Sequence, residues 1–546
     1  MQMLDAEILK SRAVVIDGNA TARSVLAAQL RELGLQEVRQ LARVQDARML
    51  LEREPYDIVL CEMDFDGAPM SGQDLLDELR REQLLPAATA FVLLTANASY
   101  ARVVEAAQAN ADGFLVKPCS ASALAERLAE VRRRKRELAP LYQAMRGGDA
   151  AGAAALAEQR FAARAPYWRY AAQAAAELWL RAGRPERAQA LCEAVLEEAP
   201  QAWARLGIAR AHLARGELGA ARRQLEACVA KEGGDADAHE LLARTLVELG
   251  EFEPALQAMR SASSLTPGCL LRRQHRGALA FYLGQKEEAA SELRDAIAMG
   301  RKSRLFEPSS LLLLALLEHD ARQARNFAAL AEQVSALAAA DADAGGDSPR
   351  LRRIHELVRA LGALQARRHE AALQAARALA EEADRADFDL EAAVITLALW
   401  VRLPAAAVDA AELAAVVQAL ALRFGVSKAA TETLLGALDA RPELLERVRE
   451  GHAEIGRVAE QALGAAMKGH ADAALQLLLQ QGERTRNAKL IEMSLTLARR
   501  HADQVNDAPA LTQRAQALQA RCGAPISQLA GVARAARVPG GLALRG

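Results

Sequence analysis

The sequence predicts a parallel α/β sheet at the N-terminus, followed by a long all-α region of stacked helical pairs. Short apolar runs alternate with helical patterns over residues 1–136, which is typical of a doubly wound parallel sheet. Beyond them, glycine and alanine recur with a period of 33 or 34 residues, which is typical of a helical repeat. The chain has 546 residues, too many for one hydrophobic core, so at least two domains are expected.

The composition argues against a polyanion-binding, secreted or membrane-spanning protein. The formal net charge is -1, so the total charge selects no polyanionic partner. Six cysteines are dispersed without a C-x-x-C pair, which predicts buried thiols in a reducing compartment. The start of the chain lacks the pattern of a signal peptide, and the longest apolar run, Leu311 to Leu317, is too short to span a bilayer. We therefore expect a cytoplasmic protein.

Four apolar runs predict strands in the N-terminal part. They are Ala13–Ile16, Asp57–Cys61, Thr89–Leu94 and Gly113–Val116. Helical spacing of apolar residues predicts helices over Thr21–Leu33 and over residues 45–54, 72–82, 98–109 and 120–136. Ligands of such folds lie outside the carboxyl ends of the parallel strands, so the residues at those ends form the candidate site.

Four polar side chains follow these strands. They are Asp17, Glu62, Thr95 and Lys117. Because parallel strands end at the same edge of a sheet, we expect the two acids, the hydroxyl and the ammonium to converge there. Such a set of groups suits a divalent cation and a phosphoryl group.

The strands and the loops that follow them contain four distinctive segments: VVIDGNATARSVL, YDIVLCE, FVLLTANA and ADGFLVKP, in this order between Val14 and Pro118. Their order and spacing resemble the receiver domain of bacterial response regulators. The resemblance implies a flavodoxin-like sheet of five parallel strands. It also implies an aspartate after the third strand that accepts a phosphoryl group from a histidine kinase, and an acid pair after the first strand that holds Mg²⁺.

Four positions match the pattern of that family. Thr95 corresponds to the hydroxyl that binds the phosphoryl group, and Lys117 to the lysine that pairs with it. Pro118 corresponds to the cis-proline after that lysine, and Phe114 to the switch aromatic of the fifth strand. Two positions depart from it. Gly18 replaces one acid of the magnesium pair and leaves Asp17 as the candidate metal ligand, while Glu62 stands in place of the acceptor aspartate.

These departures weaken the expected chemistry. A glutamate is one methylene longer than an aspartate, so it misplaces an acyl phosphate relative to Thr95. Loss of a metal ligand removes charge neutralisation on which phosphoryl transfer depends. No phosphate-cradling loop, H-E-x-x-H or G-x-S-x-G motif is present elsewhere. We therefore expect no enzymatic activity, weak or no Mg²⁺ binding in this degenerate pocket, and no other cofactor.

Three interpretations of Glu62 remain open. It can be a structural carboxylate, paired with the strand-end lysine, in a receiver kept as a docking module. It can mimic the phosphorylated state by biasing Thr95 and Phe114 toward the active arrangement. Alternatively, Asp64 or Asp66 accepts the phosphoryl group, although both lie past the strand end and catalysis depends on placement within about 1 Å.

A basic run, Arg132–Arg136, lies at the end of the last predicted receiver helix. Such a run can be a nucleic-acid arm, but no aromatic residue is interleaved with it. We interpret it as the solvated face of a helix that continues toward Leu138–Met145 and joins the two domains stiffly.

The repeat is defined by glycines at Gly183, Gly216, Gly250 and Gly284, each followed five residues later by Ala188, Ala221, Ala255 and Ala289. Gly148 with Ala153 has the same offset, as do Arg367 with Ala372 and Gly469 with Ala474. Glycine takes the left-handed conformation that turns one helix into the next, and alanine lets two helices approach closely. The pattern resembles the tetratricopeptide repeat (TPR), which implies a right-handed superhelix with a concave groove for protein segments.

One segment suggests another function. Leu420 to Leu434 has the outline of a helix-turn-helix, with Gly425 at the turn. Its second helix would contribute Lys428 but also Glu432, and Asp439 follows it, whereas phosphate contacts demand a basic surface. DNA binding through this segment is therefore an alternative that we do not favour.

We expect a receiver-like domain over residues 1–136, TPR-like repeats over 137–303, divergent helical repeats over 304–523 and a mobile tail over 524–546. The resemblances imply a response-regulator-like adaptor of a two-component system, with a pseudo-receiver and a TPR scaffold. Its partners would be proteins bound through the TPR groove and the receiver surface, such as a histidine kinase or another signalling protein. We expect no membrane partner and no nucleic acid. The alternatives are a phosphorylatable response regulator in a phosphorelay and a DNA-binding regulator through residues 420–434.

Overall fold

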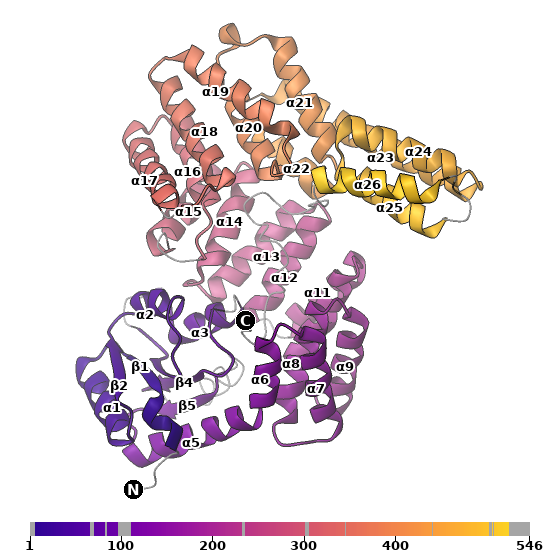
Figure 1. The fold of residues 1–546 in the computed structure, drawn as a ribbon. Helices are drawn as coiled ribbons and strands as arrows, with labels where there is room; N and C mark the ends of the chain where they lie inside the picture. Colours follow the sequence, from indigo (N-terminus) through magenta and orange to yellow (C-terminus); the bar gives the residue numbers. More distant parts are fainter. Residues whose placement is uncertain are drawn as a thin grey trace.

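The structure is a computed structural model, which describes residues 6–65, 70–81, 84–96, 111–231, 235–300, 305–343, 345–438, 441–501, 505 and 507–522. An α/β unit at the N-terminus is followed by a long succession of helices (Figure 1). The helix expected over residues 98–109, the tail expected over residues 524–546, and Asp66 and Asp439 lie outside the described residues.

The α/β unit contains a five-stranded parallel sheet in the order β2-β1-β3-β4-β5. Its strands are β1 (Arg12–Ile16), β2 (Glu37–Leu41), β3 (Ile58–Glu62), β4 (Ala90–Thr95) and β5 (Gly113–Val116). The described helices around it are α1 (Ala20–Glu32), α2 (Val44–Leu51), α3 (Gly72–Arg81) and α5 (Ala121–Glu137). The predicted fold class is confirmed.

Alternate strand residues face opposite layers of helices. One face of the sheet packs against α1 and α5 through residues such as Val15, Leu60 and Val92. The other face packs against α2 and α3 through residues such as Val59 and Leu93. Burial on both faces explains why the strands read as continuous apolar runs.

The sequence pattern missed β2. This strand, EVRQL, lies at the edge of the sheet and has no fully buried residue. An edge strand contacts one neighbour and tolerates charged side chains, so it lacks the apolar run by which the other strands were found.

The remaining chain is helical. Its first half contains α6 (Ala139–Arg146), α7 (Ala150–Ala162), α8 (Trp168–Arg181), α9 (Pro185–Glu198), α10 (Ala202–Ala214), α11 (Leu218–Lys231), α12 (Ala236–Glu248), α13 (Phe252–Leu265), α14 (Leu270–Tyr282), α15 (Lys286–Gly300) and α16 (Ser309–Asp320). Its second half contains α17 (Ala324–Asp343), α18 (Pro349–Gln365), α19 (His369–Glu381), α20 (Leu390–Arg402), α21 (Ala410–Phe424), α22 (Lys428–Ala437), α23 (Leu445–Met467), α24 (Ala471–Thr485), α25 (Ala488–Arg500) and α26 (Ala508–Cys522). None of the described helices is long and apolar enough to cross a membrane.

The turns between paired helices adopt the predicted conformation. The predicted repeat glycines, from Gly148 to Gly284, have φ between +66° and +77°, and each alanine five residues later is fully buried. Arg367 (φ +59°) and Gly469 (φ +84°) adopt the same left-handed conformation. Two more turns of this kind, at Arg322 (φ +56°) and Arg486 (φ +54°), are followed five residues later by buried Phe327 and Ile491. They escaped prediction because none of these positions carries the expected small residue.

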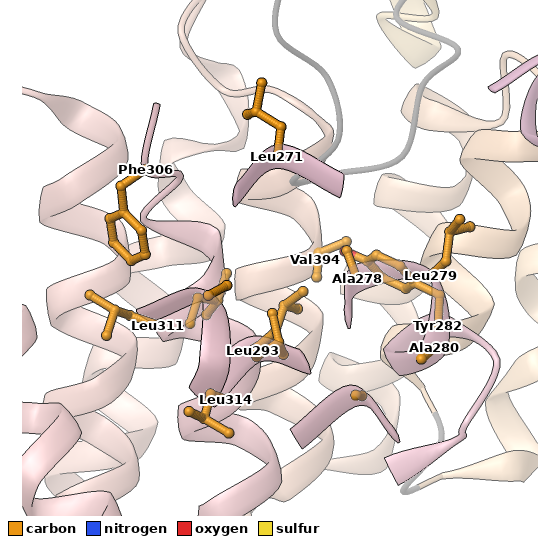
Figure 2. Close-up of a cluster of buried hydrophobic side chains, with 14 of the residues drawn as sticks. Leu271, Ala278, Leu279, Ala280, Tyr282, Leu293, Phe306, Leu311, Leu314 and Val394 are labelled. Carbon is orange, nitrogen blue, oxygen red and sulfur yellow. The ribbon is translucent and has the colours of Figure 1, made fainter. Parts of the chain in front are cut away.

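Two described helices, α16 and α20, do not line an open concave groove, contrary to expectation. All residues from Ser309 to Glu318 of α16 and from Leu390 to Val401 of α20 are buried, so both helices are covered on every side. Figure 2 shows side chains of α14, α15, α16 and α20 gathered in one buried cluster. Packing of successive first helices against one another has closed the interior.

Residues 420–434 form the end of α21, a turn at Gly425 and the start of α22, but the second helix is packed within the protein. α22, the would-be recognition helix, contacts α12, α14 and α20, and Ala430, Thr433 and Leu434 are buried. A Cβ at Gly436 would lie 2.9 Å from the Tyr282 ring, which shows how closely the two helices approach. A helix held in this way cannot enter a DNA groove, so the described structure contradicts DNA binding through residues 420–434.

A weakly paired carboxylate lies in the N-terminal repeats. The Glu177 side chain on α8 is 5% exposed. Its nearest guanidinium nitrogens are Arg181 Nε at 3.6 Å and Arg210 Nη1 at 3.9 Å, too far for hydrogen bonds. Burial raises the pKa of Glu177 from 4.5 to about 7, because the two arginines compensate only partly.

Replacing Glu177 by glutamine is expected to flatten the pH dependence of stability near neutrality. A raised pKa means that the folded state holds this proton more tightly, so the contribution is present below pH 4.5 and is lost as pH rises through 7. The loss amounts to about 3 kcal/mol at 1.36 kcal/mol per pKa unit. Urea unfolding followed by tryptophan fluorescence, with Trp179 on the same helix, measures it in both proteins. Parallel pH profiles would contradict this expectation.

Candidate functional site

Adjacent strands bring the predicted site residues together at the carboxyl edge of the sheet. Asp17 follows β1, Glu62 ends β3, Thr95 ends β4 and Lys117 follows β5. Asp17 and Thr95 are buried, whereas Glu62 and Lys117 are partly exposed. Glu62, Thr95 and Lys117 border a cavity of about 1280 Å³ that also reaches α1 and the start of α2.

Lys117 connects the two carboxylates of this pocket. Its Nζ lies 3.0 Å from Asp17 Oδ2 and donates a second hydrogen bond to Glu62 Oε1. The other Glu62 oxygen, Oε2, accepts from the backbone N–H of Gly18 at 3.2 Å. Both Glu62 oxygens are therefore engaged within the pocket.

These contacts perturb both titrating groups. Burial raises the pKa of Glu62, and the nearby Asp17 charge raises it further, while Lys117 opposes the shift. Burial lowers the pKa of Lys117, but its hydrogen bonds to Glu62 and Asp17 outweigh burial and raise it overall. The ammonium is thus held in its charged form between two acids.

The pocket offers few metal ligands. Asp17 and Glu62 already bind Lys117, and Gly18 has no side chain to contribute. Within the described part of the chain, no group of three or more His, Cys, Asp or Glu side chains is arranged to hold a metal ion. A Cβ at Gly18 would find Glu62 Oε2 and Phe65 4.0 Å away, so the backbone leaves room for the side chain that is missing.

The remaining predicted site residues lie around this pocket. Phe114 on β5 is half-buried, and Asp64 is exposed and lines the cavity. The Lys117–Pro118 peptide bond is cis, as the resemblance implies. Asp66, the second alternative acceptor, is not among the described residues.

The loop after β3 is anchored at both ends. Met63 N–H donates to Leu94 O at 2.7 Å, and Gly72 N–H donates to Met63 O at 2.8 Å. A Cβ at Gly72 would lie 2.0 Å from Glu62 O, so no other residue fits there. Ser71 and Asp74 cap α3 reciprocally, with hydrogen bonds of 2.9 and 3.0 Å. These contacts fix the backbone that carries Glu62.

The family model of the response regulator receiver domain matches residues 13–129. This part of the chain is a receiver domain. A tetratricopeptide repeat model matches residues 182–245, which confirms the repeat in α9–α12. The two matches support a protein of two-component signalling that carries a protein-interaction scaffold.

Two chemotaxis proteins each match 120 residues of this chain, about the length of the receiver domain. Chemotaxis protein CheY-3 of Vibrio cholerae is 29% identical over 120 residues, which are 22% of this chain and 90% of that protein. Chemotaxis protein CheY of Pseudomonas aeruginosa is 28% identical over 120 residues, 22% of this chain and 94% of that protein. A solved receiver domain of a Francisella response regulator is 21% identical, with a TM-score of 0.21, and covers 23% of this chain and 98% of its own.

The basic run at the end of α5 is only partly solvated: Arg133 and Arg136 are exposed as predicted, whereas two residues between them are not. Arg134 and Lys135 are buried and converge with Arg80 on the Asp112 carboxylate, at 2.6, 2.9 and 2.7 Å. Arg134 also donates to Tyr170 Oη on α8 at 3.0 Å, and its guanidinium lies over that ring. The cations therefore join the receiver domain to the first repeats. α5 ends at Glu137 and α6 begins at Ala139, with only Leu138 between them.

A second contact joins the receiver domain to α14 and α15. Arg48 of α2 donates to Met299 O near the end of α15 at 2.8 Å, and Glu78 of α3 accepts from Leu270 N–H at the start of α14 at 3.2 Å. The two side chains are buried and 3.5 Å apart. The receiver thus supplies a cation to one helix C-terminus and an anion to another helix N-terminus, where each is favourable.

These interdomain residues were not singled out from the sequence. Asp112 stands in the ADGFLVKP segment without an assigned role, and Glu78 belongs to no motif. Arg48 offered one signal, because it shares the buried face of α2 with Val44, Ala47 and Leu51. A charged residue on an apolar helix face indicates a buried partner.

Proposed function

We propose that this chain is a signalling adaptor whose receiver domain works as a pseudo-receiver, without phosphorylation and without Mg²⁺. Its TPR-type helices would bring protein partners of a two-component pathway together in the cytoplasm. One observation carries the proposal: Lys117 bridges Asp17 and Glu62, and Glu62 also accepts from Gly18 N–H.

The contacts of Lys117 with Asp17 and Glu62 support the pseudo-receiver proposal through their charge and their geometry. The Lys117 ammonium binds both carboxylates and offsets one of their two negative charges. Phosphoryl transfer to Glu62 would require breaking both of its contacts, and Mg²⁺ would have to displace Lys117 with one acid fewer than the family provides. The free-energy cost of breaking these contacts favours a pocket that does not transfer phosphoryl groups. We propose further that the protein has no enzymatic activity and binds no cofactor.

The structural interpretation of Glu62 is preferred over the phosphorylation mimic. Both of its oxygens already have partners within the protein, Lys117 and Gly18, as expected of a structural ion pair. The receiver is also fixed to the repeats through the buried contacts of Arg48 and Arg134. A receiver held on two sides supports a role as part of the scaffold.

Thermal denaturation with Mg²⁺ and beryllium fluoride, a phosphoryl analogue, tests the proposal. We expect no change in the unfolding midpoint of the wild type. The double variant Gly18→Asp/Glu62→Asp restores the acids that the family carries, and we expect its midpoint to rise because a bound ligand stabilises the folded state. A rise in the wild type that equals the rise in the variant would overturn the pseudo-receiver.

A further inference from the structure

A cleft of about 980 Å³ lies where the receiver domain meets the repeats. Its walls come from α2 of the receiver and from α14, α15, α16 and α17. We name it the junction cleft and define it by Arg48, Met49, Arg294, Ile297, Leu330 and Gln333. Its volume falls at the upper end of the range of ligand pockets, and it shares one lining residue, Gln45, with the pocket of Glu62.

Two polar atoms of the junction cleft have no hydrogen-bond partner. Arg48 Nε is one, because its nearest carboxylate oxygen, Glu52 Oε1, is 3.7 Å away. Gln333 Oε1 is the other. The Arg48 side chain is 1% exposed, and buried polar groups of native proteins are nearly always paired. A donor and an acceptor are thus left for a bound molecule to satisfy.

The charges of the cleft favour an acidic molecule. Its charged residues are Arg48, Arg273, Arg294, Asp295 and Glu318. Asp295 accepts from Arg273 at 3.0 Å and Glu318 accepts from Arg294 at 3.1 Å. Arg48 and Arg273 are also paired with Glu78 and Glu292, so Arg294 is the cation of the lining that is most open to a ligand. Arg294 remains 54% exposed, so its guanidinium can donate hydrogen bonds to a second carboxylate.

The apolar part of the cleft is formed by Ile297, Leu314 and Leu330. All three are largely buried, so they form a floor beneath the charged rim. A ligand that fits must combine an aliphatic group for this floor with a carboxylate for the arginines. It must also bring an acceptor for Arg48 Nε and a donor for Gln333 Oε1, which the C=O and N–H groups of a peptide backbone supply together.

We propose that the junction cleft binds a short acidic segment of a protein partner. An aliphatic side chain of the segment packs on Ile297 and Leu330, and a carboxylate pairs with Arg294. The segment then touches the receiver and the repeats at once, which makes the joint itself a recognition surface. This inference rests on the scaffold role proposed above and is independent of the chemistry at Glu62.

Fluorescence anisotropy on the full chain tests this surface. The probe is a fluorescein-labelled eight-residue peptide that alternates leucine with glutamate, and its matched controls carry glutamine or lysine in place of glutamate. We expect saturable binding of the acidic peptide and binding weaker by about tenfold for either control. Arg294→Gln and Met49→Asp are each expected to weaken the acidic peptide by about tenfold, because they alter the repeat wall and the receiver wall.

Arg359→Gln is the matched control, since Arg359 is exposed on α18 and pairs with Glu356 of the same helix. Circular dichroism verifies that each variant is folded. Absence of saturable binding, or equal losses in Arg294→Gln and Arg359→Gln, would overturn the proposed surface. Neither outcome bears on beryllium fluoride binding, so failure here is distinguishable from failure of the pseudo-receiver.

Discussion

Replacing Asp112 by asparagine is expected to lower the free energy of unfolding by about 3–5 kcal/mol, the cost of breaking a buried charge cluster. The Asp112 side chain is 6% exposed and faces Arg80, Arg134 and Lys135 within 2.9 Å. Asparagine keeps the shape but removes the charge that these cations face. Urea unfolding followed by circular dichroism measures the loss. Asp46→Asn is the matched control, because Asp46 pairs with an exposed arginine on the surface of α2.

The same cluster predicts acid sensitivity. Burial raises the pKa of Asp112, but Lys135, Arg80 and Arg134 outweigh burial and hold this pKa well below its usual range. Stability from a depressed pKa is present above the unfolded value of 3.8 and is lost as pH falls below it. The difference between wild type and Asp112→Asn should therefore shrink as pH is lowered from 5 toward 2. A difference that is constant with pH would contradict the electrostatic account.

Replacing Arg48 by methionine is expected to release the receiver domain from α14 and α15 and to cost about 3 kcal/mol, because a buried pair is broken by removing one partner. The substitution removes the hydrogen bond to Met299 O and leaves Glu78 buried without this cation. Small-angle scattering should show a larger radius of gyration. Limited proteolysis should cut faster between the receiver and the repeats.

Arg43→Met controls for this experiment, since the Arg43 side chain is 76% exposed and pairs only locally with Asp46. An unchanged radius in Arg48→Met, together with unchanged stability, would show that the Arg48–Glu78 pair does not hold the domains together. A loss of stability without expansion would place the effect of Arg48 within the receiver itself.

Much of this fold was predictable because its signals are local. The central strands are apolar runs since both faces of the sheet are covered, and the repeat turns are visible because glycine adopts φ above zero at low cost. The edge strand β2 and the turn at Arg322 carry no such signal. Closure of the helical interior by α22 was not predictable, since it depends on contacts between residues far apart in the chain, such as Gly436 and Tyr282.

The candidate site was predictable to a similar extent. The order of strands and loops placed Asp17, Glu62 and Lys117 at one edge, where the structure brings them into contact. The bridging position of Lys117 required coordinates, because a sequence does not show which carboxylate a flexible lysine reaches. The burial of Arg134 and Lys135 could not be predicted for the same reason. Their partner, the Asp112 carboxylate, lies on another element, directly before β5.

The pseudo-receiver is tested most directly by intact-mass measurement after incubation with Mg²⁺ and a small phosphodonor such as acetyl phosphate. The account predicts no phosphoryl adduct on the wild-type chain and an adduct on Gly18→Asp/Glu62→Asp, which shows that the donor and the fold are competent. A phosphoryl adduct on the wild type, mapped to Glu62, Asp64 or Asp66, would contradict the account and establish a working phosphorelay protein.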